Sequence, residues 1–239
     1  MDREGIHVFG VMPKRLGETD LYNLLQPWFE QLEPSTDTGY PCSVMNSEGE
    51  TTRESVTSLQ DLETLATDGV SGGFNLPRDP PVYYDQMPVS VDIYQEDGNL
   101  FPIPAYRLYV HWDDLSPSSD YGRKNIQSLL DLVTHMHEYY DLRYTYGFAS
   151  YEAPPLSDSQ YHLTYEEIED GSVDTLYWLN IFPPSIVEQF GHERVTSAPA
   201  FEIRKLDSGA VLLVVDEDPV EYNQDKWTAV EECLELTAV

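Results

Sequence analysis

The side chains best suited to chemistry in this sequence are a histidine and two aspartates that stand close together. His111 precedes Asp113 and Asp114 by two and three positions, and a carboxylate beside an imidazole can tune it as a general base. This group supports the hypothesis of a hydrolase or transferase. A histidine beside aspartates at the end of a strand is also common without catalysis, and we adopt that second interpretation, with no catalytic residue assigned.

Two other histidines lie on a predicted helix. His135 and His137 are two positions apart, which places them on different helix faces, whereas two imidazoles that share a metal on one helix stand four apart. His137 falls on the apolar stripe of the helix. We therefore expect His137 to be a hydrogen-bonded core residue and His135 to face solvent.

Carboxylates cluster at two places, Glu166–Asp170 and Asp216–Asp218. Two-metal and glycosidase chemistry needs carboxylates that converge from separate elements into a cleft. In a chain with 43 acidic residues, local clusters arise from composition alone. We expect solvated faces here, with no metal and no cofactor bound.

Motifs of phosphate binding and of nucleophilic catalysis do not occur in the sequence. The pair Gly72-Gly73 before Phe74 is the nearest approach to a glycine-rich loop. We interpret it as a flexible turn.

The charge balance bounds the range of partners. The 239 residues contain 43 Asp plus Glu against 13 Lys plus Arg, a formal net charge of −30. Such a field repels phosphate backbones and anionic lipid, so no direct nucleic-acid partner and no membrane partner are expected. Hydrophobic residues make up 41% of the chain, which predicts a folded core.

Three explanations of the acidity stay open. Carboxylates scattered along the whole chain, with only four lysines, are typical of halophilic proteins that stay soluble in concentrated salt. A carboxylate surface can also mimic nucleic acid in the basic site of a nuclease. A divalent-cation buffer is the weakest explanation, because no ligand loop is present.

The N-terminal half alternates strands and helices. An apolar strand is expected over Ile6–Met12, followed by a helix over Leu21–Leu32 that Thr19 caps and Pro27 kinks or restarts. A short strand over Cys42–Met45 and a helix that begins after Ser58 follow.

The middle and C-terminal parts continue the same alternation. We expect two strands, 82–96 and 106–112, about the turn Asp97–Asn99, and then the clearest helix of the chain. Its apolar stripe is Ile126, Leu129, Leu130, Val133, Met136, His137 and Tyr140. Strands over 144–150 and 176–182, a helix between Pro183 and Gly191, a hairpin about Asp207–Gly209 and a helix over Asn223–Leu236 complete the prediction.

Hairpins outnumber crossovers in this pattern, which favours an α+β fold with a mostly antiparallel sheet and helices on one side. We expect one domain over 1–239. A subdivision into 1–80 and 81–239 is the alternative, with the boundary near Pro77–Pro81. Residues Met1–Gly5 carry no apolar signal core, so the expected location is the cytoplasm. Cys42 and Cys233 have no metal-binding spacing and are expected to be free thiols.

The C-terminal half carries a pattern known from other proteins. The segment Thr175–Gly191 combines an aromatic strand containing Trp and Asn with a Pro-Pro helix start and a Phe-Gly helix end. Ser197–Phe201 is an Ala-Pro-Ala step, and the hairpin Glu202–Asp218 closes on Asp-Pro. Tyr144–Ala149 matches the strand that follows the long helix in such proteins. In these features the chain resembles the immunity-protein families of polymorphic toxin and type VI secretion systems.

The resemblance implies a non-enzymatic protein that binds and neutralises a cognate protein toxin, for which a basic nuclease is one candidate. A structural or assembly protein of a salt-adapted cell or virus is a further alternative. The motif residues themselves are spaced as parts of the scaffold: Trp178, Phe182, Phe190 and Phe201 as core residues, and Asn180 and Pro199 as backbone organisers.

The net charge of −30 predicts that stability rises with salt. The Debye length falls from about 30 Å at 0.01 M to about 3 Å at 1 M ionic strength, which screens the repulsion between carboxylates. The melting temperature at pH 7 should therefore increase along a NaCl series. The same series near the isoelectric point of about 4.2 is the control, and an equal increase there would contradict the electrostatic explanation.

Overall fold

The computed structural model describes residues 5–13, 19–32, 39–75, 89–94, 104–149, 173, 175–221 and 223–236. Its strands are β1 (Gly5–Val11), β2 (Tyr40–Asn46), β3 (Thr51–Val56), β4 (Gly69–Asn75), β5 (Val89–Tyr94), β6 (Ala105–His111), β7 (Tyr144–Ala149), β8 (Leu179–Phe182), β9 (Glu202–Lys205) and β10 (Val211–Val214). Its helices are α1 (Leu21–Leu32), α2 (Leu59–Ala66), α3 (Asp120–Tyr140), α5 (Pro184–Phe190), α6 (His192–Thr196) and α7 (Gln224–Leu234), with a 3₁₀ turn, η2, over Trp112–Asp114.

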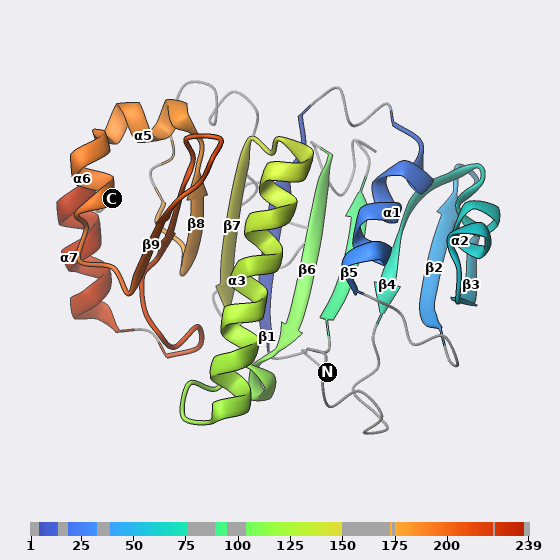
Figure 1. Cartoon of the computed structure of the whole chain (residues 1–239), viewed down its shortest axis with the longest axis horizontal. Helices are drawn as coiled ribbons and strands as arrows, with labels where there is room; N and C mark the ends of the chain where they lie inside the picture. The colour runs from blue at the N-terminus through green and yellow to red at the C-terminus, as the bar shows by residue number, and fades with distance from the viewer. Residues whose placement is uncertain are drawn as a thin grey trace.

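All ten strands belong to one open sheet in the order β3-β2-β4-β5-β6-β1-β7-β8-β10-β9 (Figure 1). Every neighbouring pair is antiparallel. The α+β class and the antiparallel sheet predicted from the sequence are confirmed.

The first strand of the chain lies in the middle of this sheet. β1 pairs with β6 on one side and with β7 on the other. Gly10 stands opposite Tyr106 in β6, and a Cβ atom at Gly10 would overlap the Tyr106 ring. The absence of a side chain there lets the Tyr106 ring cover the neighbouring strand.

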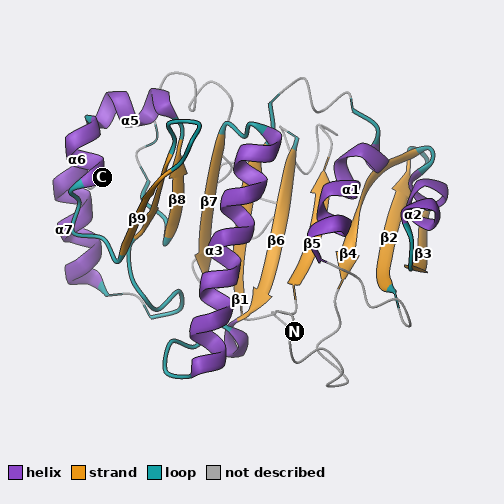
Figure 2. Cartoon of the chain, viewed as in Figure 1, coloured by secondary structure: helices purple, strands orange, loops and turns teal. Residues whose placement is uncertain are grey.

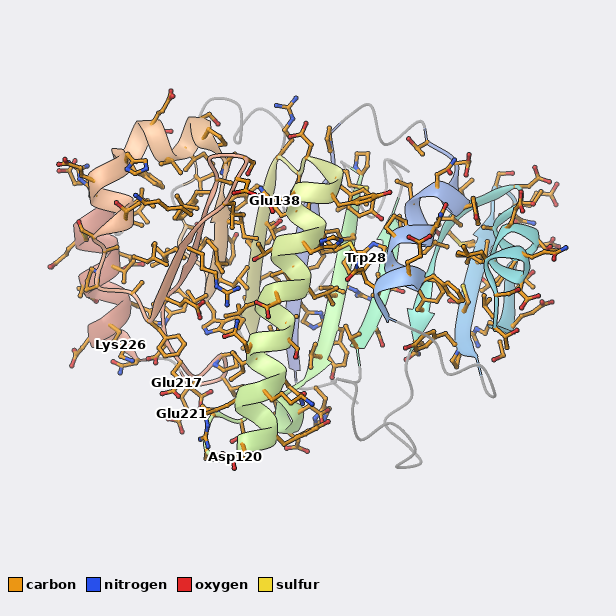
Figure 3. The ribbon with its side chains drawn as sticks, viewed as in Figure 1. Trp28, Asp120, Glu138, Glu217, Glu221 and Lys226 are labelled. Atoms are coloured by element: carbon orange, nitrogen blue, oxygen red, sulfur yellow. The ribbon has the colours of Figure 1, made fainter. Side chains whose placement is uncertain are left out.

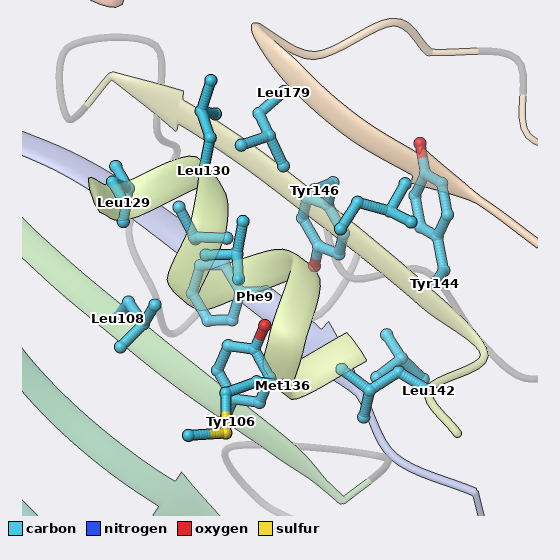
Figure 4. Packing of buried hydrophobic residues seen from close by; sticks show 14 of the residues in the cluster. Phe9, Tyr106, Leu108, Leu129, Leu130, Met136, Leu142, Tyr144, Tyr146 and Leu179 are labelled. Carbon is cyan, nitrogen blue, oxygen red and sulfur yellow. The ribbon is translucent and has the colours of Figure 1, made fainter. Parts of the chain in front are cut away.

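One face of the sheet is covered by α1, α2 and α3 (Figure 2). The predicted stripe of α3 is buried at every position and packs on strand residues such as Leu108 and Tyr106, as Figure 4 shows. On the opposite face, at the β8 end, the ring of Phe190 in α5 packs edge-on against Phe182, with the ring centroids 5.5 Å apart. The core therefore extends along the helical face and wraps round the sheet at its C-terminal end.

Helix α1 differs from the prediction at its start. The carboxylate of Asp20 accepts a hydrogen bond from the Asn23 N–H at 3.0 Å, so Asp20 and not Thr19 caps the helix. The helix continues through Pro27. Pro27 cannot donate to the carbonyl of Asn23, but Asn23 is exposed, and water can take the place of the missing donor. The Tyr140 hydroxyl of α3 donates to the Leu24 carbonyl at 2.6 Å and ties the two helices together.

The interpretation of Gly72-Gly73 as a flexible turn is wrong, because both residues lie inside β4. A Cβ atom at Gly73 would overlap the carbonyl oxygen of Val91 in β5, and one at Gly72 would lie 2.7 Å from the Ser43 carbonyl oxygen in β2. The glycines let three strands approach closely. The neighbouring strand β3 was not predicted, since its side chains are exposed except for Val56.

The C-terminal elements match the prediction closely. Pro184 is the first residue of α5, and Gly191, with φ of +87°, follows its end. Gly209, with φ of +85°, lies in the turn of the β9–β10 hairpin. Asn223 caps α7 through the Lys226 N–H. Strand β6 ends at His111, so the predicted extension to Trp112 is wrong.

Several predicted features lie outside the described residues: the turn Asp97–Asn99, residues 82–88, the boundary Pro77–Pro81 and the cluster Glu166–Asp170. Cys42 is buried, Cys233 is half-buried, and both thiols are free as predicted. Among the helices of the described ranges, none combines the length and the apolar character needed to cross a bilayer.

A buried polar contact joins α3 to the centre of the sheet. The Nδ1 atom of His137 lies 3.0 Å from the Thr145 hydroxyl of β7, so the prediction of a hydrogen-bonded core histidine is confirmed. Burial lowers the pKa of His137 to about 4, although the carboxylate of Asp141 opposes the shift. The imidazole is therefore neutral at pH 7.

Acid should destabilise the protein partly through this residue. The unfolded chain takes up a proton at His137 near pH 6.5, whereas the folded chain resists it until about pH 4. Stability from this source is complete above pH 6.5 and falls by up to about 1.4 kcal/mol per pH unit on acidification toward 4. His137→Asn should remove that share of the pH dependence in urea titrations. His135→Asn, at an exposed position, is the control, and equal slopes for the two variants would contradict the assignment.

Candidate interaction surface

His111 and Asp113 meet, as the enzymatic hypothesis requires, but in a capping geometry. His111 is the N-cap of η2, where its Nδ1 atom accepts a hydrogen bond from the Asp113 N–H at 3.3 Å. The carboxylate of Asp113 lies 3.6 Å from the same nitrogen. Asp114 is buried, and its carbonyl accepts from the side chain of Asn125 at 2.8 Å. The contacts of His111, Asp113 and Asp114 thus stabilise the η2 turn that follows β6 and leads to α3.

The acidic run Asp216–Asp218 is only partly the solvated face that the sequence predicts. Asp216 is buried and pairs with Lys226 of α7, Oδ1 to Nζ 2.7 Å. The Asp218 carboxylate accepts from the backbone N–H groups of Val220 and Glu221. An open depression of about 440 Å³ near the start of α7 is lined by Asp216, Asp218, Glu221, Asn223, Gln224 and Asp225. Figure 3 shows Glu217, Glu221 and Lys226 in this region. Within the described ranges, no three His, Cys, Asp or Glu side chains gather as metal ligands.

The motif residues of the C-terminal half have structural roles. Asn180 is fully buried, and its side chain bonds to both backbone groups of Tyr177. Its Nδ2 donates to the Tyr177 carbonyl at 2.7 Å, and its Oδ1 accepts from the Tyr177 N–H at 3.2 Å. The same Oδ1 accepts from the Tyr144 hydroxyl at 2.8 Å. Trp178 donates its indole N–H to the Asp216 carbonyl at 2.9 Å. The interpretation of Asn180 as a backbone organiser is confirmed.

Trp178, Phe182 and Phe190 are buried as predicted. Phe201 is not: 46% of it is exposed. Its backbone N–H bonds to the Val214 and Val215 carbonyls, which place it just before the edge strand β9. This position beside the edge strand leaves the side chain partly open to solvent. Tyr121 and Tyr139 on α3 are exposed as well.

Contacts with the helices, together with the strand register, show which side chains lie on each face of the sheet. The Tyr106 ring of β6 meets Trp28 of α1, ring centroids 4.8 Å apart, and Thr145 of β7 meets His137 of α3. Side chains alternate along a strand, so Arg107 and Tyr146 point the other way. We call the side of the sheet opposite α1, α2 and α3 the far face.

An aromatic row lies in the middle of the far face, formed by His7, Tyr109, Phe148 and Tyr177. The ring centroids of His7 and Tyr109 are 5.1 Å apart, and those of Phe148 and Tyr177 are 5.9 Å apart. All four side chains are half-buried. Burial and the nearby Arg107 charge lower the pKa of His7 to about 4, so its ring is neutral at pH 7.

Small polar side chains occupy the far face between β6 and the β3 edge. We call this region the polar patch and define it by Ser43, Arg53, Ser71, Asn75, Ser90 and Asp92. All six are exposed or half-buried. The sequence analysis missed the patch, although the period-two pattern in β2 and β5 carried the signal: Cys42, Val44, Val91 and Ile93 are buried, and the residues between them are polar.

The sequence matches no model of a known protein family, and it matches no curated protein. Among solved structures, the chain is similar to one described as Pseudomonas aeruginosa T6SS protein PA0821, with a TM-score of 0.58 at 10% identity. The similarity covers 97% of this chain and 72% of that one. At this identity the two chains share a fold.

Asn180→Ala should destabilise the protein by about 3 kcal/mol, because it leaves the buried Tyr144 hydroxyl and Tyr177 backbone groups without their partner. The free energy of unfolding in urea measures the loss. Asn75→Ala, at an exposed strand position, is the matched control and should cost less than about 1 kcal/mol. Equal losses for the two variants would show that the hydrogen bonds of Asn180 contribute no more to stability than an exposed side chain does.

Proposed function

We propose that the chain is a non-enzymatic immunity protein that binds and neutralises a cognate protein toxin. The observation that carries the proposal is the similarity to a T6SS protein over 97% of the chain. The sequence resemblance to immunity-protein families of polymorphic toxin and type VI secretion systems supports the immunity role independently. Both observations concern the scaffold, and toxin binding is our inference from them.

The motif residues support this proposal as parts of the scaffold rather than as a contact surface. Trp178 and Asn180 are buried, and their side chains donate hydrogen bonds to backbone carbonyls. A rigid frame of this kind can present different exposed side chains to different toxins. Toxin specificity is then located on exposed side chains outside the motif.

Charge favours a basic partner, such as a nuclease. A chain of net charge −30 attracts Lys-rich and Arg-rich surfaces and repels acidic ones. In concentrated salt this attraction acts only at contact distance, since the Debye length is about 3 Å at 1 M. Aromatic contacts of the kind available on the far face then contribute most of the affinity. We place the action of the protein in the cytoplasm, where it can meet a toxin before damage occurs.

The proposal predicts that a gene adjacent to this one encodes a secreted or contact-delivered toxin. Expression of that toxin alone should stop growth, and co-expression of this chain should restore it. The purified proteins should form a stable complex at the salt concentration of the source cell. A toxin that kills equally with and without this chain would refute the proposal.

His111→Ala separates binding from catalysis in the same assay. A binding protein neutralises its toxin stoichiometrically, so the variant should protect cells as well as the wild type. If the variant folds, binds the toxin and no longer protects, the hydrolase or transferase hypothesis takes precedence.

A further inference from the structure

The distribution of charge over the far face differs from that of the chain as a whole. Across the described parts of β3, β2, β4, β5, β6, β1 and β7, the far-face side chains include one carboxylate, that of Asp92. Asp92 pairs with Arg107 on the next strand, 2.5 Å from carboxylate to guanidinium. The other acidic residues of the described ranges lie outside these far-face strand positions.

Strand register brings the neutral side chains into one continuous row. Arg53 of β3 stands opposite Ser43, Ser43 opposite Gly73, Gly73 opposite Asp92, and Asp92 opposite Arg107. Among the described strand residues, this row of five strands carries one carboxylate, which is few for a chain of net charge −30.

The side chains of the polar patch are able to form hydrogen bonds. Gly73 adds no side chain to its middle, and the Ser90 hydroxyl donates to the side-chain oxygen of Asn75 at 3.0 Å. Next to the patch, Tyr109 begins the aromatic row. Depletion of charge together with Tyr, Arg and aromatic side chains is the composition of the centre of a protein interface.

Acidic side chains border this region at the outer end of the sheet. Glu48 and Glu50 lie in the β2–β3 turn, and Glu54 lies on β3 with its side chain toward the helical face. All three are exposed. A second copy of the chain would bring two such acidic borders together, so charge favours a partner that carries lysine or arginine there.

We propose that the polar patch and the aromatic row form the contact surface for the partner protein, and that this partner is a folded protein with a flat, uncharged centre and a basic rim. The assignment rests on the proposed function, because it names the surface through which the toxin is bound. The helical face and the α5–α7 end remain outside the contact. The acidic border contacts the basic rim of the toxin, and the patch and the aromatic row fix its position.

The test places one new arginine on each face of the sheet. Ser43→Arg and Asn75→Arg add bulk and positive charge to the polar patch, where both side chains reach solvent. Ser128→Arg makes the same change on the exposed side of α3 and is the matched control. The probe is a catalytically inactive form of the toxin encoded by the adjacent gene. Binding is measured by titration calorimetry, and the melting temperature of each variant confirms the fold.

We expect each patch variant to weaken toxin binding at least about tenfold, as the loss of one strong interface contact does, while Ser128→Arg binds like the wild type. If the patch variants bind as tightly as the wild type, the surface assignment is wrong and the immunity function stands. If the wild type itself does not bind, both proposals fail. A wild-type chain that is dimeric by sedimentation and becomes monomeric on Ser43→Arg would assign the patch to a second copy and overturn the inference.

Discussion

The pairing of β1 between β6 and β7 holds this protein together. Without β1, the sheet separates into β3-β2-β4-β5-β6 and β7-β8-β10-β9. The contact joins residues near the start of the chain to partners about a hundred or more positions later, and closing such loops costs entropy that only later packing offsets. Glycine at position 10 makes the site compatible with the overlying Tyr106 ring. The aromatic row, which brings together His7, Tyr109 and Phe148 from β1, β6 and β7, forms only when this pairing does.

The two faces of the sheet differ in what covers them. Its helical face is filled by α1, α2 and α3, and buried far-face side chains such as Phe9, Tyr146 and Phe182 belong to the same hydrophobic core. Its far face is closed by α5 at the β8 end, aromatic in the middle and small and polar toward β3. The polar patch contributes little to the core, so its side chains can vary with little loss of stability, which suits the binding role proposed for it.

The family-like motif illustrates how sequence patterns mark scaffolds. Asn180 and Trp178 both bond to backbone atoms, and any substitution there leaves buried polar groups unpaired. The backbone geometry therefore requires these residues. The backbone does not require a particular side chain at positions such as Ser43 or Asn75. A sequence motif therefore does not reveal a contact surface.

The sequence by itself determined the elements whose patterns are local: the stripe of α3, the Pro184 start and Gly191 end of α5, and the β9–β10 hairpin, because periodicity and caps depend on near neighbours. It also determined the acidic charge and, through alternation, that one side of the outer strands is polar. Only the tertiary structure decided that Gly72-Gly73 belongs to a strand, that Phe201 is exposed at an edge, and that Ser43, Asp92 and Arg107 form one row. Those facts depend on which strands become neighbours, and strand order is set by packing between residues far apart in the chain.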